Sequence, residues 1–134
     1  AMGADMNQTI KAIAEAEAYP GPSLIIGYAP CEMHSIKGGM GNCQKEMKRA
    51  VECGYWNMFR FNPALKAEGK NPFILESKEP KTEDYRKFMM GEARYSALTR
   101  AFPERAEELF EQAAQNSRAR YDHLVRLGEL YAAK

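Results

Sequence analysis

The apolar run SLIIGYA, residues 23–29, constrains the fold more than any other stretch of the chain. It is short and continuous, and it lies between the turn-forming residues YPGP (19–22) and Pro30. Such a run is typical of a strand that is buried on both faces, as in parallel sheets. We therefore expect residues 23–29 to form an inner strand of an α/β sheet.

Helical and extended patterns alternate around this run. Residues 7–18 and 42–52 carry apolar side chains at helical spacing, and Gly54 is placed to end the second helix. The stretch YWNMFRF (55–61) predicts a second strand, on one face of which lie Tyr55, Phe59 and Phe61. Helix, strand, helix and strand in this order predict an α/β sheet with crossover connections.

The pattern changes after Asn62. NPALKAEGKNP (62–72) predicts a loop with one helical turn, and a brief edge strand is expected at 73–75. Everything beyond Pro80 is predicted helical, and Pro103 stands where proline favours the start of a helix. We divide the chain into residues 1–80, part of an α/β domain, and residues 81–134, a helical tail. Two strands rarely make a stable sheet, so we expect the sheet to continue outside this chain.

Composition excludes several classes of protein. The chain of 134 residues has 28% charged residues and a formal net charge of +1, which gives no electrostatic reason to expect nucleic acid as a partner. No apolar run approaches the roughly 18 residues that span a bilayer, so no membrane is expected either. Three cysteines form no disulfide pattern and indicate a cytoplasmic protein with reduced thiols. The chain opens AMGADMNQT without an initiator Met, which favours a piece of a longer protein.

Cys31 is the strongest candidate for chemistry because it follows the first predicted strand, and open α/β sheets bind ligands beyond the carboxyl ends of their strands. It is equally consistent with a small buried hydrophobe. Cys31 and His34 form a C-x-x-H pair that Cys43 and Cys53 could complete as a zinc site, although the later spacings fit no compact zinc motif. Cys43, at a helix start, could also be a nucleophile with His34 as its base.

The strings AEAYPGPSLIIGYAPC, H-x-I-x-x-G-M and AVECGYWNMFRFNP, followed by GKNPFILESKEP and FPERAEEL, resemble the C-terminal part of the pyruvate:ferredoxin (flavodoxin) oxidoreductases. The resemblance covers roughly residues 1–109. It implies a homodimeric enzyme that oxidatively decarboxylates pyruvate, forms acetyl-CoA from coenzyme A, and reduces ferredoxin or flavodoxin. It also implies thiamine pyrophosphate with Mg²⁺, [4Fe-4S] clusters, and a thiamine-binding-type parallel sheet with flanking helices.

Within this family, the cysteine of the Y-A-P-C motif is the fourth ligand of the cluster nearest the thiamine. The resemblance therefore implies that Cys31, in Tyr28-Ala29-Pro30-Cys31, is a cluster ligand and that the remaining ligands lie upstream. Ser35 departs from the family pattern, which commonly has glycine there, and Met58 replaces the usual leucine. The chain also lacks the thiamine-binding G-D-G…N motif, so we expect it to be inert without the rest of the oxidoreductase chain and its second subunit.

Two alternatives from other classes remain open. One is a stand-alone zinc protein that uses Cys31, His34, Cys43 and Cys53. The other is a non-catalytic interaction module that is built around the C-terminal helices. The incomplete sheet argues against both.

Overall fold

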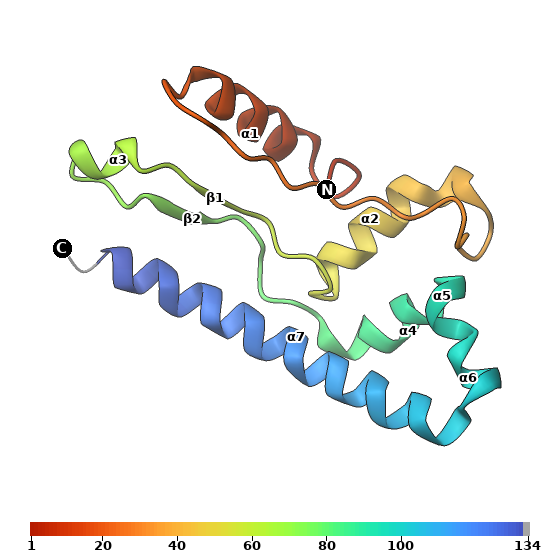
Figure 1. Ribbon diagram of the computed structural model, residues 1–134. Coiled ribbons are helices and arrows are strands. Elements are labelled where there is room, and N and C mark those ends of the chain that lie inside the picture. The colour runs from red at the N-terminus through yellow and green to blue at the C-terminus, as the bar shows by residue number, and fades with distance from the viewer. Residues whose placement is uncertain (133–134) are drawn as a thin grey trace.

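The computed structural model describes residues 1–132, in which seven α-helices accompany one two-stranded sheet. The elements are α1 (Met6–Ala18), α2 (Cys43–Glu52), β1 (Phe59–Phe61), α3 (Ala64–Ala67), β2 (Phe73–Leu75), α4 (Tyr85–Met89), α5 (Ala93–Ser96), α6 (Leu98–Ala101) and α7 (Pro103–Ala132). The β1–β2 hairpin lies between the first helix, α1, and the last, α7; the short helix α3 lies at the tip of the hairpin, and α4, α5 and α6 gather near the start of α7 (Figure 1). Short 3₁₀ turns, Met40–Asn42 and Thr82–Asp84, precede α2 and α4.

Helix α1 confirms the helix that was predicted over residues 7–18. The carboxylate of Asp5 accepts the Gln8 N–H at 3.0 Å and so caps the helix start. The apolar positions Ile10 and Ile13 are more than half exposed, so the apolar side of α1 is not covered by the rest of the chain. Polar contacts hold this helix instead.

Arg60 of β1 is the centre of these contacts. Its guanidinium pairs with Glu15 of α1 and with Oε1 of Glu76, the latter at 3.0 Å. Asn62 donates to Glu15 Oε1 at 2.9 Å, and Gln8 donates to Glu76 Oε2 at 2.7 Å. The side chains of Arg60, Glu15 and Glu76 are each at least three-quarters buried, so water screens these ion pairs less than pairs at the open surface. The network fixes α1 against the hairpin.

The pKa of Glu15 makes this attachment dependent on pH. Burial disfavours its charged form, but the hydrogen bonds from Asn62 and Arg60 outweigh burial and lower the pKa. The stabilisation is therefore complete above the usual glutamate value and is lost as the pH falls through the lowered value. We expect Glu15→Gln to weaken the attachment of α1 by about 1 kcal/mol at pH 7, and the difference from the parent to vanish at acid pH.

Hydrogen exchange of the α1 amides in the full-length protein, corrected for intrinsic exchange rates, measures this effect. Glu17→Gln is the matched control, because Glu17 is exposed on the same helix and has no ion pair among the described residues. Equal loosening of α1 by both substitutions would contradict a specific role for Glu15.

The β1–β2 hairpin confirms the edge strand that was predicted at 73–75. The other predicted strand, over 55–61, is shorter in the structure. β1 and β2 pair antiparallel, with Phe59 opposite Leu75 and Phe61 opposite Phe73. The predicted strand over 55–61 is reduced to its last three residues, because Tyr55 turns into the helical core and does not share a face with Phe59 and Phe61. Phe73 is buried against Gly128 of α7, whose carbonyl accepts the Asn71 amide at 2.8 Å.

Helix α7 begins at Pro103 as predicted, and its 30 residues run the length of the molecule (Figure 1). It packs against β2 at one end and against α4 and α6 at the other. The core lies where α2, α4 and α7 meet and consists of Ala50, Cys53, Tyr85, Phe88, Met89, Ala106 and Phe110. No helix within residues 1–132 combines the length and the apolar character that crossing a bilayer requires. The division of the chain at residue 80 stays a prediction.

Gly54 joins the end of α2 to α7, and it confirms the predicted helix end. Its φ of 84° is in the left-handed region that glycine favours. Its carbonyl accepts the hydroxyl of Ser117 at 2.7 Å and the guanidinium of Arg120 at 3.2 Å. A Cβ at this position would lie 2.7 Å from the Cβ of Pro80 and 2.9 Å from the Oγ of Ser117. The site therefore has no room for any side chain.

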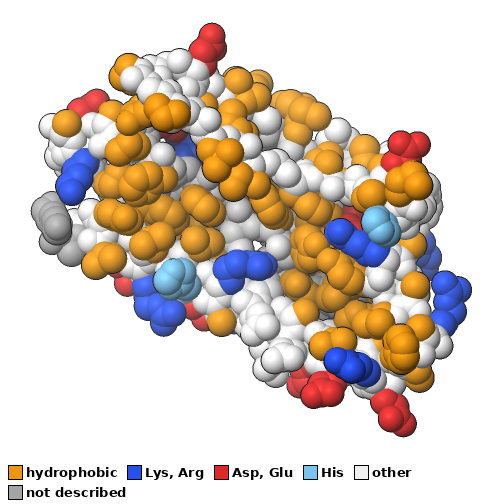
Figure 2. Space-filling view, in the orientation of Figure 1, with side chains coloured by type: hydrophobic (Ala, Val, Ile, Leu, Met, Phe, Trp, Pro, Cys, Tyr) orange, Lys and Arg blue, Asp and Glu red, His pale blue; other side chains and the backbone are white. Residues whose placement is uncertain are grey.

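The segment 23–29 is extended but unpaired, which corrects the prediction of a strand that is buried on both faces. Leu24 is 83% exposed and Ile26 is 68% exposed. The described residues form one antiparallel pair of strands and no parallel pair, so the thiamine-binding-type parallel sheet is not confirmed by this chain. An inner strand needs a partner on each edge, and residues 1–132 supply neither. Hydrophobic side chains cover much of the face of the molecule that Figure 2 shows.

Candidate functional site

Cys31 lies at the end of the extended segment, where the chain turns. Pro30 is buried, residues 32–34 form the turn, and the Ser35 N–H donates to the carbonyl of Cys31 at 3.0 Å. The thiol of Cys31 is free and half-buried. The turn therefore holds a reduced cysteine at the surface of the molecule, beyond the end of the predicted strand.

The turn also brings His34 to Cys31, as the C-x-x-H spacing suggested. A hydrogen bond from the His34 side chain is the largest cause of a lowered pKa for the Cys31 thiol, and the backbone amides of His34 and Met33 act in the same direction. A lowered pKa increases the thiolate fraction, and the thiolate is the form that binds metals. The chemistry of Cys31 thus suits a metal ligand.

The other two cysteines are not brought to this site. Cys43 is half-buried at the start of α2, where it has a free thiol. Cys53 is 1% exposed, and burial raises the pKa of its thiol to about 11. Residues 1–132 contain no group of three or more histidine, cysteine or acidic side chains that could hold a metal ion. The four-ligand zinc site with Cys31, His34, Cys43 and Cys53 is therefore not assembled.

Ser35 closes the turn in an unusual backbone conformation. Its φ of 60° makes it the one residue other than glycine with a positive φ within residues 1–132. Glycine adopts this conformation without a steric penalty, whereas other residues lose about 1–2 kcal/mol there. Glycine, which the resemblance to the oxidoreductase family leads us to expect at this position, would adopt this φ without that penalty.

Tyr28 fixes the chain immediately before the turn. Its ring stacks on Trp56 at 5.8 Å between centroids and meets the edge of Tyr55 at 5.5 Å. Its hydroxyl donates to Oε1 of Glu92 at 2.7 Å. Burial, and then the hydrogen bond to the Glu92 carboxylate, raise the pKa of Tyr28, so its hydroxyl stays protonated and acts as a donor.

Glu92 is buried to 1% exposure beside the start of α5. Its second carboxylate oxygen, Oε2, pairs with Nε of Arg94 at 2.7 Å. Arg94 also donates to the Tyr55 hydroxyl at 3.1 Å, and this hydroxyl lies 2.7 Å from that of Tyr95. A buried carboxylate is costly unless it is paired, and here each oxygen has a donor.

The chain after the turn is bound to the same region by its backbone. Ile36, which is buried, forms an isolated antiparallel bridge with Glu92. The Lys37 N–H donates to the carbonyl of Gly91 at 2.7 Å, and the Ala93 N–H donates to the carbonyl of Ser35 at 3.3 Å. Both flanks of the Cys31 turn therefore attach to residues 91–93.

Sequence reasoning missed Glu92 and Arg94. The stretch GEARY (91–95) resembles the many interleaved acidic and basic residues of this region, which predict an exposed helical surface. The burial of Glu92 depends on Tyr28, which lies 64 positions earlier in the chain. No local pattern in the sequence indicates such a contact.

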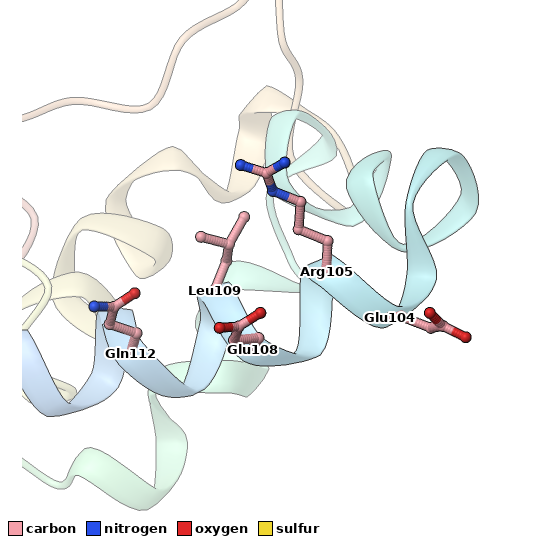
Figure 3. Close-up of a pocket in the computed structure, with 5 residues that line it drawn as sticks. All are labelled: Glu104, Arg105, Glu108, Leu109 and Gln112. Carbon is pink, nitrogen blue, oxygen red and sulfur yellow. The ribbon is translucent and has the colours of Figure 1, made fainter.

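A surface hollow on α7 is unconnected with this site. Figure 3 shows the side chains that line it, all of which come from successive turns of this one helix: Glu104, Arg105, Glu108, Leu109 and Gln112. No other element contributes a lining residue. Binding sites usually join polar groups that converge from several elements, so the hollow is not a candidate site.

Comparison with curated proteins gives close relatives, although no protein-family model matches the chain. The pyruvate-flavodoxin oxidoreductase of Enterobacter agglomerans is 56% identical over 127 residues, and that of Klebsiella pneumoniae is 52% identical over 127 residues. The pyruvate:ferredoxin oxidoreductase of Moorella thermoacetica is 53% identical over 129 residues.

These matches cover 95–96% of this chain but 11% of each relative. The chain thus spans about one ninth of the length of the curated relatives that it matches. Identity above half across nearly the whole chain confirms the resemblance that its motifs indicated. The chain is homologous to one segment of the pyruvate-flavodoxin and pyruvate:ferredoxin oxidoreductases.

Proposed function

We propose that this chain is the C-terminal segment of an oxidoreductase that decarboxylates pyruvate oxidatively, forms acetyl-CoA and reduces ferredoxin or flavodoxin. The observation that carries the proposal is the identity of 52–56% to enzymes of these names over 95% or more of the chain. By itself the segment is inert, because the groups for pyruvate, coenzyme A, thiamine pyrophosphate and Mg²⁺ come from the rest of the enzyme. Its three free thiols suit a reducing cytoplasm.

Within that enzyme, Cys31 supplies one thiolate ligand to a [4Fe-4S] cluster. Its free, half-buried thiol, its lowered pKa and its place on a surface turn all fit such a ligand. The other ligands come from chain outside this segment, since a cluster needs several thiolates and the other two cysteines here lie apart from Cys31. When bound, the cluster carries single electrons from the thiamine site towards the electron acceptor.

The extended segment 23–29 becomes an inner strand of a thiamine-binding-type parallel sheet when the rest of the enzyme is present. Its exposed Leu24 and Ile26, together with Ile10 and Ile13 of α1, support this assignment, because apolar side chains of this kind are normally covered. In the same proposal residues 1–80 complete the α/β domain. Residues 81–132 form a helical tail that packs on the body of the enzyme or on the second subunit of a homodimer; residues 133 and 134, the end of the predicted tail, lie outside the described residues.

The full-length protein that contains this segment tests the proposal when it is purified without oxygen. We expect pyruvate to drive reduction of flavodoxin or ferredoxin, with a requirement for both coenzyme A and thiamine pyrophosphate. Assays that omit pyruvate, or replace it with another 2-oxoacid, are the controls. Reduction that does not depend on pyruvate would overturn the assigned substrate, and a preparation without iron or sulfide would overturn the assigned cofactor.

A further inference from the structure

We propose that Glu92 is a positioning residue for Cys31, which it holds in place from both sides of the turn. The inference rests on the proposed function in one respect, namely that Cys31 is a cluster ligand. Glu92 would not touch the cluster. It would act through Tyr28 on one side of the turn and through Ile36 on the other.

The carboxylate of Glu92 fixes the side that enters the turn. Oε1 accepts the hydroxyl of Tyr28 at 2.7 Å, and Oε2 is occupied by Arg94 at 2.7 Å. Because Glu92 is 1% exposed, water cannot replace either donor, and loss of Tyr28 as a donor would leave a buried oxygen unpaired. The position of Tyr28, three residues before Cys31, is therefore set by a strong, charge-assisted hydrogen bond.

The backbone of the same residue fixes the side that leaves the turn. Ile36 pairs with Glu92 in an antiparallel bridge, and the neighbouring Lys37–Gly91 and Ala93–Ser35 hydrogen bonds extend this contact. Between the two anchors, the hydrogen bonds of the turn are short-range: the Ser35 N–H donates to the carbonyls of Cys31 and Glu32, and His34 and Met33 donate to the Cys31 thiol. The location of the thiol thus depends on Glu92 at both ends of the turn.

Residues that orient a metal ligand contribute to metal retention. Substitution of such a residue typically costs about 10–100-fold in metal affinity or activity. Glu92 has this role at Cys31, with the difference that it acts on the backbone that carries the ligand. Tyr28→Phe separates this role from packing, because phenylalanine keeps the ring that stacks on Trp56 and loses only the hydroxyl.

The experiment compares Tyr28→Phe and Glu92→Gln in the full-length holoenzyme with Tyr85→Phe. Glutamine keeps the shape of Glu92 but offers one acceptor oxygen to two donors. Tyr85 is a buried tyrosine whose hydroxyl makes no hydrogen bond within residues 1–132, so it is a matched control. We expect the amides of Ser35, Lys37 and Ala93 to exchange at least about tenfold faster in the two test variants and to be unchanged in the control.

A second readout addresses the cluster itself. We expect Tyr28→Phe and Glu92→Gln to lose iron to a chelator about tenfold faster than the parent, and to shift the electron paramagnetic resonance signal of one reduced cluster. A merely structural role would lower the melting temperature without moving that signal. Tyr85→Phe should leave the signal and the rate of iron loss unchanged.

The outcomes separate this inference from the proposed function. If exchange and the cluster signal are unchanged in both test variants while Cys31→Ala lowers the iron content, the positioning role is overturned and the proposed function stands. If the turn loosens in the test variants but Cys31→Ala leaves iron and sulfide intact, Glu92 holds an ordinary loop. That second outcome overturns the proposed ligand and, with it, the role of Glu92 at a cluster.

Discussion

Cys31→Ala in the full-length enzyme should degrade or remove one cluster, with a loss of between about one and about four iron atoms per chain, because each iron of a [4Fe-4S] cluster needs a ligand from the protein. We expect the rate of pyruvate-dependent flavodoxin or ferredoxin reduction to fall by more than about 100-fold, since loss of a ligand exceeds the effect of losing a residue that only orients one. Iron and sulfide analysis, electron paramagnetic resonance of the reduced enzyme and the reduction assay measure these three quantities.

Cys43→Ala is the matched control for this substitution. Cys43 is also a free, half-buried cysteine of the same segment, yet the geometry does not bring it to Cys31. We expect its iron content and activity to equal those of the parent. Equal cluster loss in both variants, or full iron content in Cys31→Ala, would overturn the assignment of Cys31 as the one ligand from this segment.

Gly54→Ala should strongly destabilise the junction between α2 and α7. A non-glycine residue in the left-handed conformation and an overpacked contact with Pro80 and Ser117 together destabilise by about 2–5 kcal/mol. The same change disturbs the carbonyl that accepts Ser117 and Arg120 of α7. Hydrogen exchange of the last turn of α2 and the facing part of α7 in the full-length protein measures the loss.

Gly69→Ala separates the conformational penalty of a positive φ from the effect of overpacking. Gly69 has a φ of 69°, but a Cβ there would meet no atom within 4 Å. We expect it to lower the free energy of opening by about 1–2 kcal/mol, the conformational penalty alone. If Gly54→Ala and Gly69→Ala lowered the free energy of opening equally, close packing at the junction of α2, Pro80 and α7 would not contribute to the loss of stability in Gly54→Ala.

Local signals predicted most of the helices and the edge strand. Pro103 at the start of α7, Gly54 after α2 and the turn residues before β2 act on the backbone within a few positions, so they operate whatever surrounds them. The C-x-x-H spacing was part of the zinc alternative, and His34 does lie beside Cys31, because one turn of chain is enough to join them.

Long-range contacts could not be predicted. The apolar run 23–29 predicts burial, but burial needs neighbours that residues 1–132 do not contain. Tyr55 was placed on a strand face with Phe59, whereas the aromatic core formed with Phe88 and Tyr95 draws it inward. Glu92 was missed for the same reason, because its partners become neighbours only when α5 folds back onto the start of the chain.

The unpaired edge of residues 23–29 has a consequence for work with this polypeptide on its own. An extended backbone with free N–H and C=O groups and exposed Leu24, Ile25 and Ile26 is a template to which any other extended chain can add. Two copies of this segment would satisfy each other's hydrogen bonds along that edge. Self-association of the isolated polypeptide would therefore increase with concentration. It would result from this uncovered edge and would say nothing about the subunit arrangement of an enzyme.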